Sequence, residues 1–424
     1  MHSQPPALDL SALVANASCL DDYDPNAMSV TQARHYIQQF LSPVSETETV
    51  AIKASLGRVL AEPVTSGLNV PGHNNSAMDG FAFRYAEAGD PLKVIGTAFA
   101  GTPYTAEIPV GCCIKIMTGA LIPPTVDTVV MQEHTSTKDD WVTLTKLPPV
   151  GANIRLTGED ITAGQTVLAR GHRIEPADMG LLASLGIAEI EVYRRLKLAF
   201  FSTGDELVSV GQPLLQGQIY DSNRYSLWGV LQAAGVEMHD LGNVADDPDI
   251  LEKTLLKAAA EHDVVITTGG VSVGEADFMK QLLAKHGQVL FWKINMKPGR
   301  PLAYGKIGDA HYFGLPGNPV SAMVTFYQFV QDALKHLMGT ADLTSPAFKV
   351  ECVNAIKKAT GRTEFQRGIL FKDGEDWKVK TTGEQGSGIL SSMSRANCFI
   401  VLGEKTGALA AGAIVEVQPF HGIC

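Results

Sequence analysis

Hydrophobic and polar positions change their spacing several times along the chain, and each change predicts a different kind of structure. The segment Ser29-Val-Thr-Gln32 precedes an apolar pattern of helical period that runs to Leu41, which predicts a capping box and a helix start. From about Val64 to Pro149 the pattern becomes short apolar runs interrupted by Gly and Pro, which is typical of a small β-rich domain. Helical periodicity returns between Ala177 and Leu185.

Residues 196–340 alternate between predicted strands and predicted helices. The expected strands cover 196–202, 236–244, 264–267, 289–292 and 312–315, and the expected helices cover 223–234, 276–286 and 319–338. Asp247 can cap a further helix that has Pro248 at its first position. Repeated βαβ units predict a parallel sheet with helices on both faces, and ligands at the carboxyl ends of its strands.

The last part of the chain alternates between apolar and polar residues with period two. The clearest runs cover 348–353, 377–380, 399–402 and 414–417. This spacing predicts strands, and several short strands in succession predict a small β-barrel or sandwich.

These patterns divide the chain into four predicted domains of a multidomain α/β protein. A discontinuous helical domain combines 28–63 with 159–195, an inserted β-rich lid domain covers 64–158, a doubly wound α/β ligand domain covers 196–340, and a C-terminal β-barrel covers 341–424. Residues 1–27 are polar and aperiodic, which predicts a loose arm. A chain of 424 residues also exceeds what one hydrophobic core usually organises.

Composition narrows the class of protein. The chain is 45% hydrophobic and 19% charged, a balance typical of globular proteins, and its longest apolar runs are too short to span a bilayer. A net charge of −11 argues against nucleic acid or an anionic membrane as the main partner, so an anionic ligand needs a local basic patch. The first residues show no secretory signal, and the six scattered cysteines indicate free thiols in a reducing cytoplasm.

Acidic residues occur in five loops at strand ends or beside Gly or Pro. They are Asp79, Asp160, Glu206, Asp246 and Asp277. Hard divalent cations such as Mg²⁺ prefer oxygen ligands, usually one or two carboxylates together with phosphates and water. Each acid taken alone has a simpler interpretation as a helix cap or a turn residue, so the prediction of a metal site depends on the set.

The segment 268–274, Thr-Gly-Gly-Val-Ser-Val-Gly, follows a predicted buried strand and precedes a helix. Glycines such as Gly269 and Gly270 let backbone amides approach phosphate oxygens, and the start of a helix favours negative charge. The segment matches neither common nucleotide-binding glycine motif, and a tight strand-to-helix turn remains the alternative.

Three cations lie close together in this acidic chain: Lys293, Lys297 and Arg300. On one extended segment the two lysines would share a face, because they are an even number of residues apart. Such a pair suits a phosphate or another oxyanion. The alternative is a solvated edge strand protected by lysines.

Two further strand-to-helix loops carry candidate ligand contacts. In Gly314-Leu-Pro-Gly-Asn-Pro319, the prolines Pro316 and Pro319 fix the loop, and Asn318 either caps the helix or binds a ligand. In the second loop Asp221 precedes a helix, and helix capping accounts for the nearby Asn223.

At these residues the chain resembles the molybdopterin molybdenumtransferase family, which includes the MoeA proteins and the gephyrin E domain. The resemblance extends from about residue 28 to residue 420. Its markers are Asn75-Ser-Ala-Met-Asp-Gly80, Ile116-Met-Thr-Gly119, Gly158-Glu-Asp160, Ser202-Thr-Gly-Asp-Glu206, Thr268-Gly-Gly-Val-Ser272, Lys297-Pro-Gly299 and Leu315-Pro-Gly-Asn-Pro319. Arg300 departs from the family, in which lysine is common at this position.

The resemblance implies a cytoplasmic homodimer of four-domain subunits. The family converts adenylylated molybdopterin and molybdate into molybdenum cofactor and AMP with a divalent cation, usually Mg²⁺. The resemblance implies catalytic roles for the five loop acids introduced above. It further implies that three of them, Asp79, Glu206 and Asp246, hold the metal. Substrate contacts are expected from Thr118, Asp221, Gly269, Gly270, Ser272, Lys293, Lys297, Arg300, Pro316, Asn318, Pro319 and Arg367.

Three other functions compete with molybdenum insertion. One is an adenylyltransferase that makes the adenylylated pterin, although the predicted lid and barrel favour insertion. Another is a scaffold of the gephyrin type, which need not keep Asp79 together with Lys293 and Lys297. A nicotinamide-dependent oxidoreductase is disfavoured because the dinucleotide fingerprint is absent. Other proteins of cofactor biosynthesis or delivery are expected partners.

Overall fold

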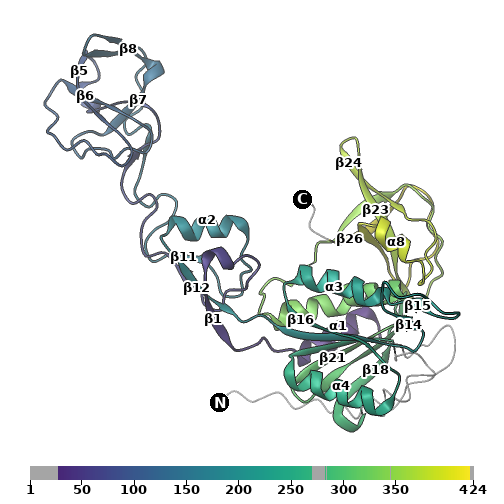
Figure 1. The fold of residues 1–424 in the computed structure, drawn as a ribbon. Coiled ribbons are helices and arrows are strands. Elements are labelled where there is room, and N and C mark those ends of the chain that lie inside the picture. The colour runs from purple at the N-terminus through teal and green to yellow at the C-terminus, as the bar shows by residue number, and fades with distance from the viewer. Residues whose placement is uncertain (1–26, 270–281, 283, 344, 421–424) are drawn as a thin grey trace, which may run out of the picture. The chain divides into compact units, whose positions relative to one another are not determined.

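The computed structural model describes residues 27–269, 282, 284–343 and 345–420, which form two compact units (Figure 1). Unit 1 comprises the chain up to Glu48, residues 57–59 and the chain from Val192 onward. Unit 2 comprises residues 49–56 and 60–191. Unit 2 is therefore an insertion in the chain of unit 1.

A six-stranded sheet forms the centre of unit 1, in the order β16-β13-β17-β21-β20-β18. Its strands are β13 (Lys197–Thr203), β16 (Glu237–Val244), β17 (Val264–Thr268), β18 (Gly287–Lys293), β20 (Pro301–Ile307) and β21 (Ala310–Leu315). The first four strands in this order pair in parallel, whereas β20 is antiparallel to both of its neighbours, β21 and β18. The prediction of a parallel sheet therefore holds for four strands only, because the two-residue turn at Gly308-Asp309 cannot join parallel strands.

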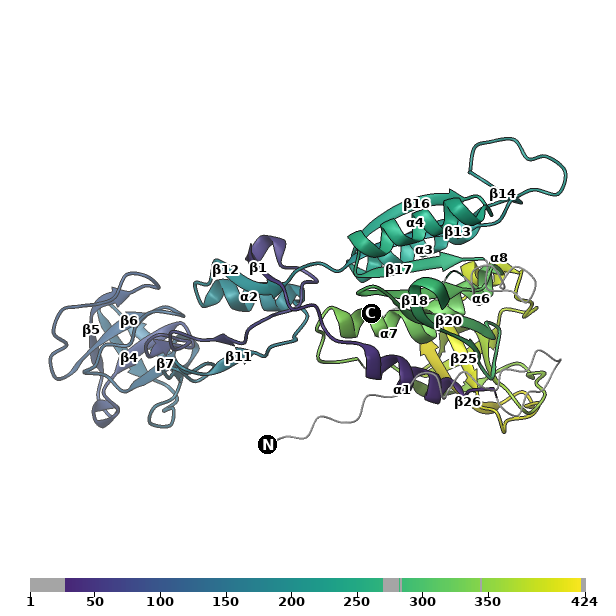
Figure 2. The same cartoon turned by 90° about the horizontal axis from the view of Figure 1, so that it is seen from below.

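Helices cover both faces of this sheet, which confirms the doubly wound α/β class (Figures 1 and 2). One face carries α1 (Val30–Phe40), α3 (Ser222–Ala234), α6 (Pro319–Thr325), η5 (Phe326–Val330) and α7 (Gln331–Leu337), and the other carries α4 (Pro248–Glu261). Alternate residues of β13 serve the two cores: Phe200 packs on the first face and Phe201 on the second. This alternation follows from the two-residue period of a strand.

Several local signals in the sequence are confirmed in the structure. Ser29 and Gln32 form the capping box of α1, and Asp247 caps α4 by accepting hydrogen bonds from two backbone amides. Gly235 ends α3 in the left-handed conformation. The helix expected from Pro319 contains a π-helical segment, η5, between α6 and α7. No helix in the described ranges has both the length and the apolarity needed to cross a membrane.

The C-terminal part of unit 1 is a closed five-stranded barrel, as predicted. Its strands are β22 (Phe348–Cys352), β23 (Thr363–Asp373), β24 (Asp376–Thr381), β25 (Cys398–Leu402) and β26 (Ala413–Pro419), and α8 (Leu390–Arg395) precedes β25. The barrel closes because β23 pairs with both β24 and β25. A short strand, β19 (Met296–Lys297), joins the outer edge of β23 and links the barrel to the α/β sheet.

Unit 2 contains a six-stranded sheet in the order β7-β4-β6-β5-β9-β8. Its strands are β4 (Gly80–Phe83), β5 (Leu92–Ala98), β6 (Cys112–Ile116), β7 (Thr128–Met131), β8 (Thr135–Lys138) and β9 (Trp141–Leu144). Both faces of the sheet are covered by small hydrophobic cores. The rest of the unit consists mainly of α2 (Pro176–Ser184) and the strand pairs β2 (Val64–Thr65) with β11 (Thr166–Leu168) and β3 (Asn75–Ser76) with β10 (Ile154–Arg155).

The remaining elements are short. They are the pair β1 (Thr47–Ala51) with β12 (Glu189–Tyr193), the pair β14 (Leu207–Val208) with β15 (Ile219–Tyr220), and the 3-10 turns η2 (Ile52–Ala54), η3 (Tyr85–Glu87) and η4 (Gln132–His134).

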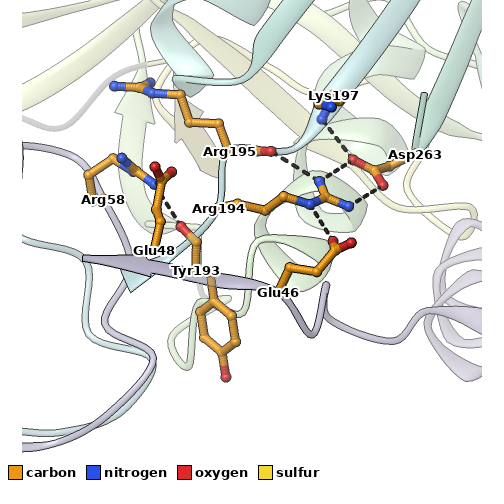
Figure 3. A network of polar contacts seen from close by, with 8 residues as sticks. All are labelled: Glu46, Glu48, Arg58, Tyr193, Arg194, Arg195, Lys197 and Asp263. Carbon is orange, nitrogen blue, oxygen red and sulfur yellow. Dashed lines mark hydrogen bonds and ion pairs between the residues drawn. The ribbon is translucent and has the colours of Figure 1, made fainter. Parts of the chain in front are cut away.

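A network centred on Arg194 fixes the chain segments of unit 1 that flank the insertion (Figure 3). The Nη1 and Nη2 atoms of Arg194 donate to the two carboxylate oxygens of Asp263 at 2.6 and 2.7 Å, and its Nε donates to Glu46. Asp263 also accepts a hydrogen bond of 2.8 Å from the Lys197 amide. The network thereby joins both flanking segments to the amino ends of β13 and β17.

Candidate functional site

The loops that follow the parallel strands of unit 1 meet at one edge of the sheet. Strands β13, β17 and β21 end in register, because Ser202 pairs with Thr268 and Thr268 pairs with Leu315. The loops beyond these ends carry five of the predicted site residues: Glu206, Gly269, Pro316, Asn318 and Pro319. Ligands of open α/β sheets bind at this edge.

Gly269 is packed tightly between neighbouring loops. Its φ angle is +88°, and a Cβ atom at this position would lie 2.4 Å from the carbonyl oxygen of Thr203. Its amide donates to the Leu315 carbonyl at 3.3 Å. Only glycine fits here without moving the backbone, so the start of the glycine segment is held in a fixed position between β13 and β21.

Exposed acids lie on two neighbouring loops of this edge. Glu206 follows β13 and Asp246 follows β16, and both residues are exposed. The Asp246 amide donates to Oδ1 of Asp205 at 3.4 Å, which connects the two loops. Oxygen donors on adjacent loops suit a hard cation such as Mg²⁺.

Asp221, which is 1% exposed, caps α3 by accepting a hydrogen bond of 3.2 Å from the Arg224 amide. The sequence interpretation assigned the capping role to Asn223, and that assignment is wrong. The Nδ2 atom of Asn223 instead donates to the Gly317 carbonyl at 2.7 Å. Asn223 therefore connects α3 to the loop of Pro316 and Asn318, whereas the exposed side chain of Asn318 makes no capping hydrogen bond.

Four buried polar atoms at this edge have no hydrogen-bond partner within the described part of the chain. They are Oγ1 of Thr203, Oδ2 of Asp221, Oδ1 of Asn223 and Oδ1 of Asn243. Buried polar groups are nearly always paired in folded proteins, and an unpaired one is costly. The cluster therefore marks a place where a ligand, water or a residue outside the described ranges supplies the missing partners. Thr203 and Asn243 were not among the predicted site residues, although Thr203 directly follows the predicted strand 196–202 and Asn243 lies near the end of the predicted strand 236–244.

The predicted basic segment does not form one extended strand. Lys293 is the last residue of β18, whereas Lys297 lies in β19 and pairs with the barrel strand β23. Between them the chain turns, because the Met296 amide donates to the Ile294 carbonyl at 2.8 Å. The prediction that both lysines share a face of one strand is therefore wrong.

The loop after Lys297 packs against helix α6. Gly299 has a φ angle of +91°, and a Cβ atom there would lie 2.5 Å from Oγ1 of Thr325. The next residue, Arg300, has a buried Nε without a partner in the described structure. Because α6 starts at Pro319, the basic loop and the loop of Asn318 are attached to the same helix.

Arg367 lies inside the barrel and is 1% exposed. Its Nε donates to Oγ of Ser392 at 2.9 Å and its Nη2 to the Gly386 carbonyl at 3.0 Å. Burial lowers the pKa of Arg367 to about 10. The segment that it holds reaches α6, because the Ser387 carbonyl accepts a hydrogen bond of 3.1 Å from the Val320 amide.

Three predicted site residues, Asp79, Thr118 and Asp160, are exposed residues of unit 2. Asp79 precedes β4 and Thr118 follows β6, and Oδ1 of Asp79 accepts 2.7 Å hydrogen bonds from both the amide and the hydroxyl of Thr118. These hydrogen bonds lower the pKa of Asp79, which therefore stays ionised at neutral pH. Asp160 lies in a loop that is bound to the neighbouring chain through a 3.1 Å hydrogen bond from its amide to the Val70 carbonyl.

Gly270, Ser272 and Asp277 lie outside the described residues, as does most of the helix expected at 276–286. Within the described ranges, no three acidic, histidine or cysteine side chains come together as a metal site. The predicted metal ligands Glu206 and Asp246 belong to unit 1 and Asp79 to unit 2.

Three family profiles match the chain in succession. They are described as the MoeA N-terminal region (domain I and II) over residues 28–186, a probable molybdopterin binding domain over 199–336, and the MoeA C-terminal region (domain IV) over 349–420. The second match covers the α/β sheet and its strand-end loops. The fold and this site therefore define a protein of molybdenum cofactor biosynthesis with a molybdopterin-binding α/β domain.

Relatives narrow this class to one enzyme family. The molybdopterin molybdenumtransferase of Haemophilus influenzae is 44% identical over 399 residues, which cover 93% of this chain and 99% of that protein. The enzyme of the same name from Nostoc is 38% identical over 85% of this chain and 86% of that protein. The crystal structure of the molybdopterin biosynthesis moeA protein from Pyrococcus horikoshii OT3 matches with a TM-score of 0.82 and 28% identity, over 93% of this chain and all of that chain. The chain belongs to the molybdopterin molybdenumtransferase family.

Proposed function

We propose that this protein inserts molybdenum from molybdate into adenylylated molybdopterin, which gives molybdenum cofactor and releases AMP in a Mg²⁺-dependent reaction. The observation that carries the proposal is the strand-end edge of unit 1. A glycine backbone, four buried polar atoms without a partner among the described residues, and a basic loop that packs against the adjoining helix α6 occur there. This combination suits a phosphorylated ligand beside an oxyanion.

The phosphate-bearing part of the substrate binds at the glycine segment. Gly269, whose own amide is bound to the Leu315 carbonyl, lets the ligand approach the backbone closely, and the Gly270 amide and the Ser272 hydroxyl donate to phosphate oxygens. The unpaired Oδ2 of Asp221 accepts a hydrogen bond from the ligand. Thr118, Asn318 and the loop fixed by Pro316 and Pro319 complete the substrate contacts.

Molybdate binds near Lys293, Lys297 and Arg300, whose charges offset its negative charge beside an anionic dithiolene. Arg367 acts as a positioning residue, because its hydrogen bonds hold the segment that contacts the start of α6. Arg300 presents a guanidinium where a lysine is common in the family, and this change preserves the positive charge.

Carboxylates of Asp79, Glu206 and Asp246 would hold the Mg²⁺, and Asp160 and Asp277 would complete the acidic set. The donors fit this ion, because all are oxygen ligands and those described are exposed. When bound, Mg²⁺ acts as a Lewis acid on the phosphoanhydride. The carboxylates also balance the charge of the neighbouring cations.

We place this enzyme in the cytoplasm as a homodimer that passes its product to other proteins of cofactor biosynthesis or delivery. In this proposal Asp79, Thr118 and Asp160 act on the strand-end edge of the facing subunit. A mixed dimer of Asp79→Asn and Lys297→Ala subunits then regains AMP release, because one of its two sites is intact. Mixed dimers as inactive as the parents would contradict a shared site.

The direct test is AMP formation by the purified protein from adenylylated molybdopterin, molybdate and Mg²⁺. The proposal predicts AMP release that is lost with chelator and in the Lys297→Ala variant, and retained in Lys349→Ala, which removes an exposed lysine on β22 of the barrel. Consumption of ATP with unmodified molybdopterin would identify an adenylyltransferase instead. A folded protein inactive in both assays would favour a scaffold.

A further inference from the structure

A basic recess lies in the barrel part of unit 1, beside the proposed molybdate site. Lys297, Glu364, Ala408 and the loop 357–362 line this cavity of about 680 Å³. The loop connects the region of β22 to β23, so the recess is formed mostly by the barrel. We call it the barrel recess.

The charge of the barrel recess is opposite to that of the whole protein. Its lining contains four cations, Lys297, Lys357, Lys358 and Arg362, and a single carboxylate, Glu364. The whole chain carries a net charge of −11. Among the described residues, the only ion pair in the lining joins Nζ of Lys297 to Glu364 at 3.8 Å. The other three cations, Lys357, Lys358 and Arg362, make no ion pair within the described part of the lining.

Lys358 is a buried cation in the lining of the recess. The residue is 8% exposed, and its Nζ donates to the carbonyls of Ala359 at 3.0 Å and Thr406 at 2.8 Å. An ammonium group has three donors, so one remains for another acceptor. Burial lowers the pKa of Lys358, the charges of Glu364 and Glu404 oppose this, and those of Arg362 and Lys297 lower it again. An anion in the recess would give this buried ammonium a charged acceptor.

The loop that carries these cations is held in place by its backbone. The Gly361 carbonyl accepts a 2.7 Å hydrogen bond from Nδ2 of Asn295, and the Gly361 amide donates to the Glu404 carbonyl at 2.8 Å. Nε2 of Gln366 donates to the Lys357 carbonyl at 3.2 Å. Because the backbone of the loop is held from three sides, the positions from which its cations extend are fixed, and the backbone needs little ordering when an anion binds.

We propose that the barrel recess binds a tetrahedral oxyanion, through Lys357, Lys358 and Arg362. Free molybdate and the phosphate of a nucleotide share this chemistry, and the recess has room for either. Lys297 and Lys357 also line a neighbouring cavity of about 500 Å³ that includes the segment 383–386 held by Arg367. The recess therefore adjoins the proposed molybdate site and supplies it with the anion. This last step rests on the proposed function, whereas oxyanion binding does not.

Titration calorimetry on the full chain tests the proposal with molybdate, inorganic phosphate and AMP as separate probes at fixed ionic strength. We expect binding that weakens roughly tenfold or more in Arg362→Ala and in Lys357→Ala, because each removes a charged donor. Lys349→Ala is the matched control and retains binding. Molybdate binding alone identifies free molybdate as the ligand, whereas AMP binding tighter than phosphate identifies a nucleotide phosphate.

Steady-state kinetics then tests the oxyanion-binding proposal independently of the proposed function. If molybdate is the ligand, Arg362→Ala raises the molybdate KM for AMP formation and leaves kcat within about twofold. Arg362-dependent oxyanion binding in a protein that forms no AMP would uphold the recess and refute the proposed function. Equal affinity of wild type, Arg362→Ala and Lys357→Ala for all three probes would overturn the recess, as would failure of the wild type to bind any of them.

Discussion

The ion-pair network at the base of the insertion allows a sharp test of the energetics. Replacing Asp263 with Asn keeps the size of the side chain and removes its charge. Asp263 accepts three hydrogen bonds, two from Arg194 and one from the Lys197 amide. Asn has only one acceptor oxygen and no charge, so at least one of the two hydrogen bonds from Arg194 is lost together with the ion pair. The hydrogen bond from Arg194 to Glu46 remains.

The expected loss of stability follows from burial. The side chains of Arg194 and Asp263 are 24% and 23% exposed. Breaking a fully buried pair costs about 3–5 kcal/mol. Partial exposure and the remaining acceptor of Asn reduce this cost, so we expect Asp263→Asn to lower the free energy of unfolding by about 2 kcal/mol.

The pH dependence gives the same interaction a second signature. Burial acts to raise the pKa of Asp263, but hydrogen bonds from Arg194 and the Lys197 amide outweigh it, so the pKa in the folded protein is lowered. A carboxyl with a lowered pKa stabilises the fold above its unfolded pKa of about 3.9, and this contribution is lost as the pH falls through the folded pKa. The difference between wild type and Asp263→Asn should therefore be constant from about pH 5 to 7 and shrink below about pH 4.

Urea denaturation followed by far-UV circular dichroism measures both effects. The matched control is Asp309→Asn, which changes an exposed acid in the turn between β20 and β21. The control should lie within about 0.5 kcal/mol of wild type. A loss in Asp263→Asn no larger than in the control, or a difference that does not change below pH 4, would refute the assignment.

Three other predictions concern the site and the core. Gly269→Ala should abolish AMP formation with near-normal circular dichroism, since its Cβ would approach the Thr203 carbonyl to 2.4 Å; normal turnover would show that this backbone is not used. Asp79→Asn should bind the adenylylated pterin but fail to release AMP, and normal release would remove Asp79 from the mechanism. Burial, aided by the charge of Lys306 and opposed by that of Asp263, lowers the pKa of His311 to about 4. Between about pH 6.5 and pH 4 the unfolded chain binds a proton at His311 that the folded protein does not bind, so the free energy of unfolding should fall over this range. Urea denaturation of wild type and His311→Gln measures this fall. An equally steep fall in His311→Gln would contradict the prediction.

Local signals in the sequence predicted the fold well where neighbouring residues determine the structure. The capping box of Ser29 with Gln32, the start of α4 at Asp247-Pro248 and the end of α3 at Gly235 depend on contacts within one helical turn. The strand β20 was not predicted, because its residues 301–307 begin with Pro and are buried on both faces, so they show no alternation.

Site residues were predicted less completely, because their placement depends on residues far away in the chain. The strand-end position of Glu206 and Gly269 followed from the βαβ pattern. The positions of Lys293 and Lys297 did not, because pairing of β19 with β23 separates them. The cations of the barrel recess could have been noticed as Lys357-Lys358 and Arg362 within six residues of an acidic chain.

The two places where the chain enters and leaves the insertion are direct neighbours, since the Arg194 amide donates to the Glu46 carbonyl at 3.0 Å. A short turn joining Glu46 to Arg194 would delete unit 2 and leave the sheet and barrel of unit 1 continuous. The same adjacency allows a domain to be inserted or exchanged at this point while the ends of unit 1 stay side by side. Modularity of this kind lets the two halves of the enzyme be studied, swapped between species or redesigned separately.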